Sequence, residues 1–404
     1  MRYWLVLPLW ILTSLSAASA KVVVFWQEGF PTVESQPIKQ ETLRNALGEM
    51  QPQFAGVDEL KNPATLADAD LLVLPYGSAF PADCWEAIHG YLQNGGNLLN
   101  LGGWPLAVAV VRQQSGFAQQ SPGNAYSRAL GIWHTYEVPQ KDAVRFGWRE
   151  EFSFLTARQV NARRVFVTGM WWGSGETLGM GYLLNGRNER VAAPVVREDF
   201  RELRGGEHSG YLGARCVMLN FEPEPGYWST PDGVTLIRES AEYARQGANL
   251  LWVEMQNATL APGEIPHLIV HAVNLRRQRL GLPIQGRVRL EVISGDQVIE
   301  TAEVAISGDS VAAPVEFAKT LPPGLYGVRA TLEIEGKVRE IYQTGFWSRD
   351  EKLLKTGPTL GAGRTYFRKD GAAFLPFGTN YFTTDIYPGS FGFQSSSKDR
   401  KAHV

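Results

Sequence analysis

The carboxylate pair Glu222 and Glu224 is the clearest candidate for acid–base chemistry in the sequence. The two residues flank Pro223 directly after an apolar segment, so their side chains could face the same way. Hydrolysis of a glycosidic bond needs two carboxyl groups, which lie about 5–5.5 Å apart in enzymes that retain configuration. A solvated loop after a strand explains the pair more simply, and we predict that the chain carries no catalytic residue.

A second acidic group comprises Glu198, Asp199, Glu202, Glu207 and His208. Carboxylates and imidazoles can bind metal ions, but metal sites show ligand spacings such as His-x-x-x-His, which this group lacks. We therefore predict a charged loop here, with no metal and no cofactor bound to the chain.

Four tryptophans are the main candidates for ligand binding. Trp171 and Trp172 are adjacent, and Trp104 and Trp228 fall in or near predicted loops. Sugar rings present apolar C–H faces that suit aromatic side chains, and an indole adds a polar N–H. Two adjacent indoles cannot easily both be buried. We predict that these residues bind a poly- or oligosaccharide; the alternative is that they fill contacts within the folded chain.

The composition is that of a globular protein with little net charge. The 404 residues are 44% hydrophobic and 20% charged, and the formal net charge is -2. This small charge argues against nucleic acid or an anionic membrane surface as a partner. Cys84 and Cys216 both lie in apolar segments, so we favour two separate buried thiols over a disulfide.

The first 20 residues contain the three parts of a secretory signal. Met1-Arg2 is the charged start, residues 3–15 are mostly apolar, and Ala18-Ser19-Ala20 supplies small residues for cleavage. The apolar run is shorter than the ~20 residues that span a bilayer, and no later segment is long and apolar enough. We predict a signal peptide cleaved after Ala20 and a secreted or periplasmic protein.

Residues 21–247 show strands that alternate with helices. Apolar runs at 22–26, 70–74 and 97–101 are typical of buried strands, and a helix is predicted at 81–93. This alternation predicts a three-layer α/β domain built on a parallel sheet.

Residues 248–346 change to a period of two. Val288, Leu290 and Val292 alternate with charged residues, and Gly- and Pro-containing turns separate the apolar runs. About seven such strands in about 100 residues predict an immunoglobulin-like β-sandwich. Residues 347–364 are a predicted linker, and Asp370-Gly371 predicts the turn of a hairpin.

The first block resembles the flavodoxin-like class I glutamine-amidotransferase fold, in the catalytically silent version found in some β-galactosidases. The resemblance rests on residues 70–74, Tyr76-Gly77-Ser78 and the segment 95–103. It implies a sharp elbow after a strand, where active members present a nucleophilic cysteine. Gly102 or Gly103 holds that position here, and no Gly-x-Ser-x-Gly motif supplies another nucleophile. The resemblance thus implies a silent scaffold. A homo-oligomer that forms through this α/β domain is a further partner hypothesis.

Residues 365–404 resemble the entry to the catalytic barrel of the large retaining glycoside hydrolase clan that includes β-galactosidases and β-mannanases. The matching residues are the hairpin 367–371 and the strand 374–381. A whole (β/α)8 barrel takes about 250 residues, so the resemblance implies only its truncated start. It implies the N-terminal, non-catalytic portion of a secreted glycoside hydrolase acting on O-glycosidic bonds, inactive alone. The alternative is a complete non-catalytic glycan-binding or assembly protein.

Overall fold

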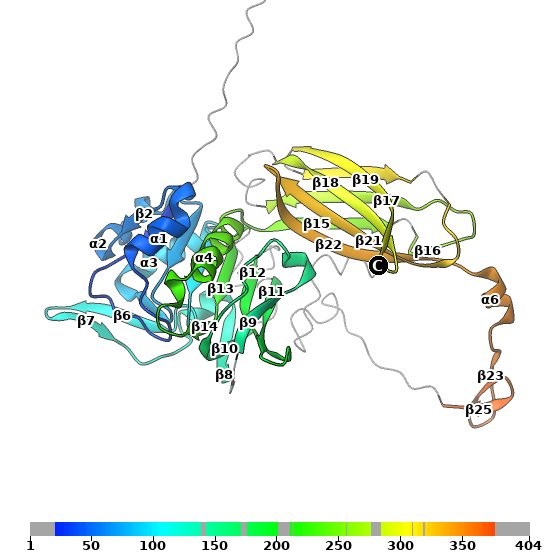
Figure 1. Cartoon of the computed structure of the whole chain (residues 1–404), viewed down its shortest axis with the longest axis horizontal. Helices are drawn as coiled ribbons and strands as arrows, with labels where there is room; N and C mark the ends of the chain where they lie inside the picture. Colours follow the sequence, from blue (N-terminus) through cyan, green and yellow to red (C-terminus); the bar gives the residue numbers. More distant parts are fainter. Residues whose placement is uncertain are drawn as a thin grey trace, which may run out of the picture.

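The chain forms two bodies followed by a small terminal sheet (Figure 1). The computed structural model describes residues 21–138, 143–170, 176–200, 211, 213–255, 257–275, 284–308, 310–317 and 320–375. The first body, blue to green in Figure 1, holds an eight-stranded sheet and most of the helices. The second, mainly yellow and orange, is a β-sandwich.

Five parallel strands make up one side of the eight-stranded sheet. In spatial order they are β2 (Gln53–Ala55), β1 (Val22–Phe25), β3 (Leu71–Leu74), β5 (Leu98–Leu101) and β13 (Arg215–Leu219). All residues of the central strands β1, β3 and β5 are buried, which explains their continuous apolar sequences.

Three antiparallel strands complete this sheet and correct the predicted fold class. They are β12 (Arg190–Asp199), β11 (Glu176–Asn185) and β9 (Ala143–Trp148). The predicted α/β domain with a flavodoxin- or amidotransferase-like parallel sheet is therefore wrong, because the sheet is mixed and strands outnumber helices in the described chain. Only residues 186–189 join β11 to β12, too few for the crossover of a dozen or more residues that parallel strands need.

Four helices cover the two faces of the sheet. They are α1 (Gln40–Leu47), α2 (Val57–Leu60), α3 (Trp85–Gln93) and α4 (Pro231–Ala244). Leu43 of α1 and Leu236 of α4 belong to one buried core, while Leu60 of α2 and Ile88 of α3 belong to the core on the opposite face. The start of α4 is fixed by Thr230, whose hydroxyl accepts the Gly233 N–H at 3.1 Å.

Two small sheets extend the first body. The first consists of β14 (Phe221–Pro223), β10 (Ala162–Met170) and β8 (Ile132–Val138), all antiparallel. The second consists of β4 (Ala79–Pro81), β6 (Val108–Gln113) and β7 (Gly116–Gln119). Because β14 follows β13 after a single residue, the first small sheet begins at the carboxyl end of the parallel strands.

The second body packs a three-stranded sheet against a five-stranded one. The smaller sheet contains β15 (Asn249–Met255), β17 (His267–Asn274) and β20 (Ser310–Glu316). The larger contains β16 (Thr259–Leu260), β22 (Lys337–Ser348), β21 (Gly324–Ile334), β18 (Ile284–Ser294) and β19 (Gln297–Gly308). Val288, Leu290 and Val292 point into the core between the sheets, as expected for a strand with one buried face.

After the sandwich, α6 (Glu351–Thr356) leads to a three-stranded antiparallel sheet. Its strands are β23 (Leu360–Ala362), β24 (Phe367–Lys369) and β25 (Ala372–Phe374). Asp370 and Gly371 form the predicted turn, with φ of 50° and 82°. This meander is not the start of a (β/α)8 barrel, which corrects that part of the predicted fold; residues 376–404 lie outside the described chain.

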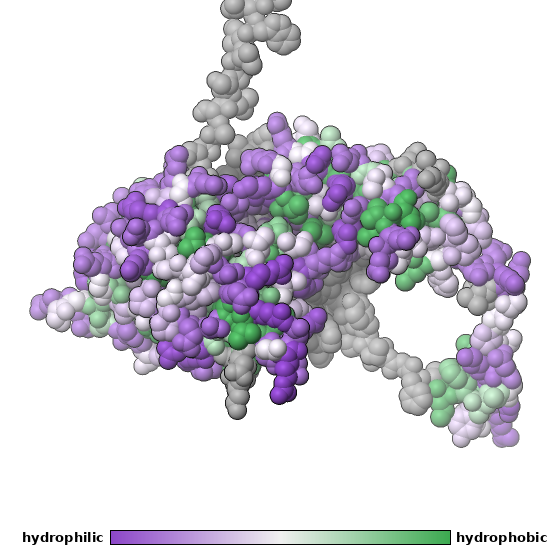
Figure 2. Space-filling model, viewed as in Figure 1, coloured by the Kyte–Doolittle hydropathy of each residue, from purple (hydrophilic) through white to green (hydrophobic). Residues whose placement is uncertain are grey.

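The terminal sheet exposes apolar side chains. Figure 2 shows green atoms at the lower right, over the terminal sheet. Leu360 and Leu375 are 63% and 61% exposed. Among the described residues, no helix is long and apolar enough to cross a membrane.

The two cysteines lie apart in the first body as buried free thiols. Cys84 precedes α3 and Cys216 lies on β13. Burial raises the pKa of Cys84 to about 12 and raises that of Cys216 as well, so both thiols stay protonated at neutral pH.

Candidate functional site

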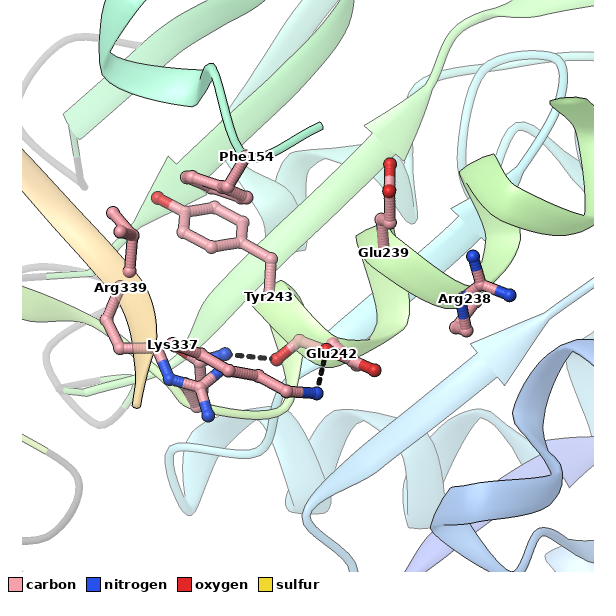
Figure 3. A pocket seen from close by; sticks show the side chains of 9 residues that line it. Phe154, Arg238, Glu239, Glu242, Tyr243, Lys337 and Arg339 are labelled. Carbon is pink, nitrogen blue, oxygen red and sulfur yellow. Dashed lines mark hydrogen bonds and ion pairs between the residues drawn. The ribbon is translucent and has the colours of Figure 1, made fainter. Parts of the chain in front are cut away.

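A pocket of about 300 Å³ lies between α4 and the sandwich strand β22 (Figure 3). We call it the junction pocket. It is lined by Phe154, Arg238, Glu239, Glu242, Tyr243, Gln246, Lys337, Val338 and Arg339. Small-molecule sites occur preferentially where two domains meet, and about 300 Å³ is the lower end of their usual volume.

Phe154 and Tyr243 form an aromatic wall of the junction pocket. Their ring centroids are 5.1 Å apart, and the rings are tilted by 40°. The Tyr243 hydroxyl accepts a hydrogen bond from Arg197 Nη1 at 2.9 Å. Burial raises the pKa of Tyr243 to about 12, so the phenol is neutral at physiological pH. Tyr243 is only 2% exposed and backs the ring of Phe154, which is half-buried, so the accessible part of this wall is the uncharged Phe154 ring.

Charged side chains of both signs surround this wall. Lys337 Nζ on β22 lies 2.8 Å from Glu242 Oε2 on α4, an ion pair that crosses the junction (Figure 3). Glu239 accepts hydrogen bonds from the Thr156 N–H at 2.7 Å and from its hydroxyl at 2.5 Å. Arg339, which is buried, pairs with Glu335 at 3.5 Å. The pocket thus offers donors and acceptors beside an apolar surface.

A buried ion cluster of Arg197, Asp199, Arg215 and Glu340 stands behind the pocket. Arg215 binds Asp199 through two hydrogen bonds of 2.7 and 2.8 Å. Glu340, on the sandwich strand β22, lies 3.2 Å from Arg197 Nη1 and 3.3 Å from Arg215 Nη2. No member is more than 3% exposed. The ion cluster joins β12 and β13 of the first body to β22, the sandwich strand that forms one side of the pocket.

The electrostatics of the ion cluster favour its charged form. Burial alone would lower the pKa of Arg215, but the negative charge and hydrogen bonds of Asp199 outweigh that effect and the pKa is raised. The Arg215 guanidinium also lies over the Tyr243 ring, 3.9 Å from its centroid. The cluster therefore positions the aromatic wall as well as the strands.

The structure places two of the four predicted tryptophans at the carboxyl end of β5. Trp228 is 1% exposed, and its indole N–H donates to Ser35 Oγ at 3.3 Å. Trp104 is half-buried, and its backbone N–H donates to Ser78 Oγ at 2.9 Å. Trp171 and Trp172 lie outside the described residues. Saccharide binding by these side chains stays a prediction.

The predicted elbow also lies at this edge. Gly102 and Gly103 have φ of 94° and 60°, in the region that favours glycine. A Cβ on Gly103 would lie 2.3 Å from Ser78 Oγ, so the close approach of the two turns requires glycine.

The acidic residues singled out in the sequence lie in different surroundings. Glu222 lies 3.5 Å from Arg163 and accepts a hydrogen bond from Gln36 at 3.2 Å, while Glu224 is exposed. Glu198 and Asp199 are buried on β12, so the prediction of a charged loop is wrong for them.

Glu202, Glu207 and His208 of the same group lie outside the described residues. Within the part of the chain that the structure describes, no group of three or more His, Cys, Asp or Glu could hold a metal ion.

Sequence reasoning missed the junction pocket. A signal was present in α4, where Arg238, Glu239, Glu242 and Tyr243 recur at the spacing of neighbours on a helix surface. Nothing local in the sequence indicates that this surface meets Lys337 almost a hundred residues later.

No protein-family model matches this chain, and no curated protein does. Among solved structures it is similar to the β-galactosidase from Bacillus circulans sp. alkalophilus, with 12% identity over 74% of this chain and 42% of that chain and a TM-score of 0.35. It is also similar to a catalytic mutant of Gan42B, a GH42 β-galactosidase from G. stearothermophilus, with 11% identity, coverages of 74% and 40% and a TM-score of 0.31.

The CARDB domain of the PF1109 protein from Pyrococcus furiosus shows 16% identity over 25% of this chain and 93% of that chain, with a TM-score of 0.20. The chain thus matches less than half the length of either β-galactosidase. TM-scores this low do not establish a shared fold, and no activity is inferred from them.

Proposed function

We propose that this chain is a non-catalytic, glycan-binding portion of a secreted glycoside hydrolase, and that the junction pocket binds a unit of a poly- or oligosaccharide. The observation that carries the proposal is the pairing of the Phe154–Tyr243 wall with charged hydrogen-bonding side chains in one pocket. A sugar ring presents an apolar face to aromatic rings and hydroxyls to such donors and acceptors.

A non-catalytic role fits the state of the carboxylates in this pocket. Glu242 is paired with Lys337, and Glu239 receives two hydrogen bonds from Thr156. Both carboxylates lie on one helix, within one turn of each other. Glycoside hydrolysis places its two carboxyl groups on either side of the scissile bond, one of them free to give a proton. Binding is therefore the role that these groups support.

The proposal includes export, with Lys21 as the mature N-terminus. Its support is the charged, apolar and small-residue pattern of residues 1–20. Mass spectrometry of the exported protein tests it: a product that begins at Lys21 agrees, and a cytoplasmic product that retains Met1 contradicts it.

The binding proposal is tested by calorimetry of the mature chain with galacto- and manno-oligosaccharides. We expect one of these glycans to bind and Phe154→Ala to weaken binding about tenfold, because an aromatic contact is worth about 0.5–1.5 kcal/mol beyond its buried area. Tyr136→Ala is the control, since Tyr136 is 59% exposed on β8 and lines no part of the pocket. If Phe154→Ala binds like the unmodified chain, the pocket is not the site. Turnover of aryl glycosides by the pure chain would refute its non-catalytic role.

A further inference from the structure

The carboxyl ends of the parallel strands hold buried polar atoms that lack a partner. Asn100, at the end of β5, and Asn220, after β13, are both 0% exposed. Asn100 Oδ1, both side-chain polar atoms of Asn220 and the indole nitrogen of Trp104 have no hydrogen-bond partner among the described residues. A buried polar group without a hydrogen-bond partner is energetically costly. Several such groups close together therefore call for an explanation.

The backbone brings these three residues together. Gly103 N–H donates to the Phe221 carbonyl at 3.3 Å, and Trp104 and Asn220 are the immediate chain neighbours of that pair. In the parallel register Met218 lies beside Asn100 and Leu219 beside Leu101, which places Asn220 beside Gly102. Asn100 Nδ2 donates to the Gly102 carbonyl at 2.7 Å. All three side chains therefore start from one short stretch of the sheet edge.

Two threonines of the adjoining small sheet add to the set. Thr168 on β10 is paired directly with Thr135 on β8, and both hydroxyl oxygens are buried without a partner among the described residues. Phe166, two residues before Thr168, donates its N–H to the Asn220 carbonyl at 2.9 Å. We call Asn100, Trp104, Asn220, Thr135 and Thr168 the strand-end cluster.

The strand-end cluster is neutral, and Arg164 on the adjoining strand β10 already has partners. Arg164 Nη2 lies 3.1 Å from Glu34 and 2.7 Å from Glu137, and its Nη1 lies 3.8 Å from Glu222. Ser78 donates to Glu34 at 2.5 Å. What is left open is a set of uncharged groups: an indole N–H, amide donors and acceptors, and two hydroxyls that can do either. Such a set matches neither an anion nor a metal ion.

We propose that the strand-end cluster is a second binding site, which takes a small neutral polyhydroxylated molecule such as a monosaccharide. Each hydroxyl of such a ligand both donates and accepts, as the cluster requires. A ligand bound in the cluster would form hydrogen bonds with these buried groups. Replacing the groups with apolar side chains of similar shape should therefore abolish ligand binding. The site is separate from the junction pocket and rests on different residues.

Protein-detected NMR of the mature chain, with isotope-labelled tryptophan, tests the proposal. The probes are galactose, mannose, glucose and glycerol, and the Trp104 indole signal is assigned with Trp104→Phe. We expect at least one probe to shift that signal saturably, and Asn220→Leu and Thr168→Val each to weaken the binding at least tenfold. Thr168→Val is nearly isosteric, which keeps the test usable if Asn220→Leu fails to fold.

Thr65→Val is the control, because the Thr65 hydroxyl already donates to the Glu59 carbonyl at 2.6 Å; it should bind like the unmodified chain. Phe154→Ala should also leave this binding unchanged, so failure at the junction pocket and failure here are seen separately. The proposal is overturned if no probe shifts the Trp104 signal and only water cross-peaks reach it, or if Asn220→Leu and Thr168→Val retain full affinity.

Discussion

The ion cluster at the junction and the two asparagines of the strand-end cluster are equally buried, but their polar atoms differ in whether they have hydrogen-bond partners. In the ion cluster Arg215 and Asp199 share two short hydrogen bonds, and Glu340 contacts both arginines. In the strand-end cluster Asn220 is just as buried, yet neither of its amide atoms has a partner among the described residues. A buried polar group is costly unless it is hydrogen-bonded. The first cluster therefore stabilises the fold, and the second suits a ligand.

The largest expected effect comes from breaking the ion cluster. Asp199→Ala leaves Arg215 buried without its closest counter-charge, which should lower the free energy of unfolding by about 3–5 kcal/mol. Asp58→Ala is the matched control, because Asp58 also binds an arginine, Arg112, at 2.8 Å, but its side chain is 69% exposed. The control should cost about 0–1 kcal/mol. Urea unfolding measures both; equal losses would show that burial does not make the Asp199–Arg215 pair more important for stability than an exposed ion pair.

Asn97 and Asn220 allow a direct comparison of a side-chain amide that is hydrogen-bonded with one that is not. Asn97 donates to the Asp70 and Arg245 carbonyls and accepts the Arg215 N–H, whereas Asn220 has none of these contacts in its side chain. Asn97→Leu should cost about 1–3 kcal/mol, because its buried partners lose their hydrogen bonds. Without ligand, Asn220→Leu should be nearly neutral or stabilising. A loss from Asn220→Leu as large as that from Asn97→Leu would contradict this comparison.

Alkaline pH probes the junction through Tyr243, whose pKa rises from 10.0 to about 12 on burial. Between these values the unfolded chain has lost the proton and the folded chain keeps it, so stability is fully present below pH 10 and falls as the pH rises toward 12. Tyr243→Phe should reduce this fall by about 1.4 kcal/mol per pH unit. The check is urea unfolding of both proteins from pH 9 to 11; identical slopes would mean that Tyr243 ionises freely.

Removal of the terminal sheet, which contains no residue of the ion cluster or the strand-end cluster, should have the smallest effect on stability. Ending the chain after Ser348 removes α6 and the sheet β23–β25, whose strand residues are exposed apart from the half-buried Phe374. The unfolding of both bodies should stay almost unchanged, and solubility should improve because exposed Leu360, Phe367 and Leu375 are lost. Calorimetry and light scattering measure the two effects. If the truncated chain loses the sandwich transition, the terminal segment is integral to that body.

The sequence allowed prediction of local elements better than of their assembly. The buried strands near residues 22–26, 70–74 and 97–101 were predictable, because continuous apolar runs of this length suit no exposed element. The antiparallel direction of β9, β11 and β12 was not predictable. It depends on the geometry of short connections, which the pattern of apolar residues within one strand does not reveal.

For the candidate sites too, single residues could be predicted from the sequence but their assembly could not. Trp104 was recognised from its residue type and its position in or near a predicted loop, and it belongs to the strand-end cluster. The junction pocket could not be predicted, because Lys337 and Glu242 meet only when the sandwich packs against α4. Asp199 was predicted to lie in a charged loop, and only the assembled sheet shows that it is buried against Arg215.

Glycan binding at the junction is tested most directly by a crystal structure of the mature chain with the oligosaccharide that binds best in calorimetry. We expect a sugar ring in the pocket against Phe154, with hydroxyls near Lys337 and Glu239 and with the ion cluster unchanged. An empty junction pocket in crystals that hold the same glycan elsewhere on the chain would contradict it.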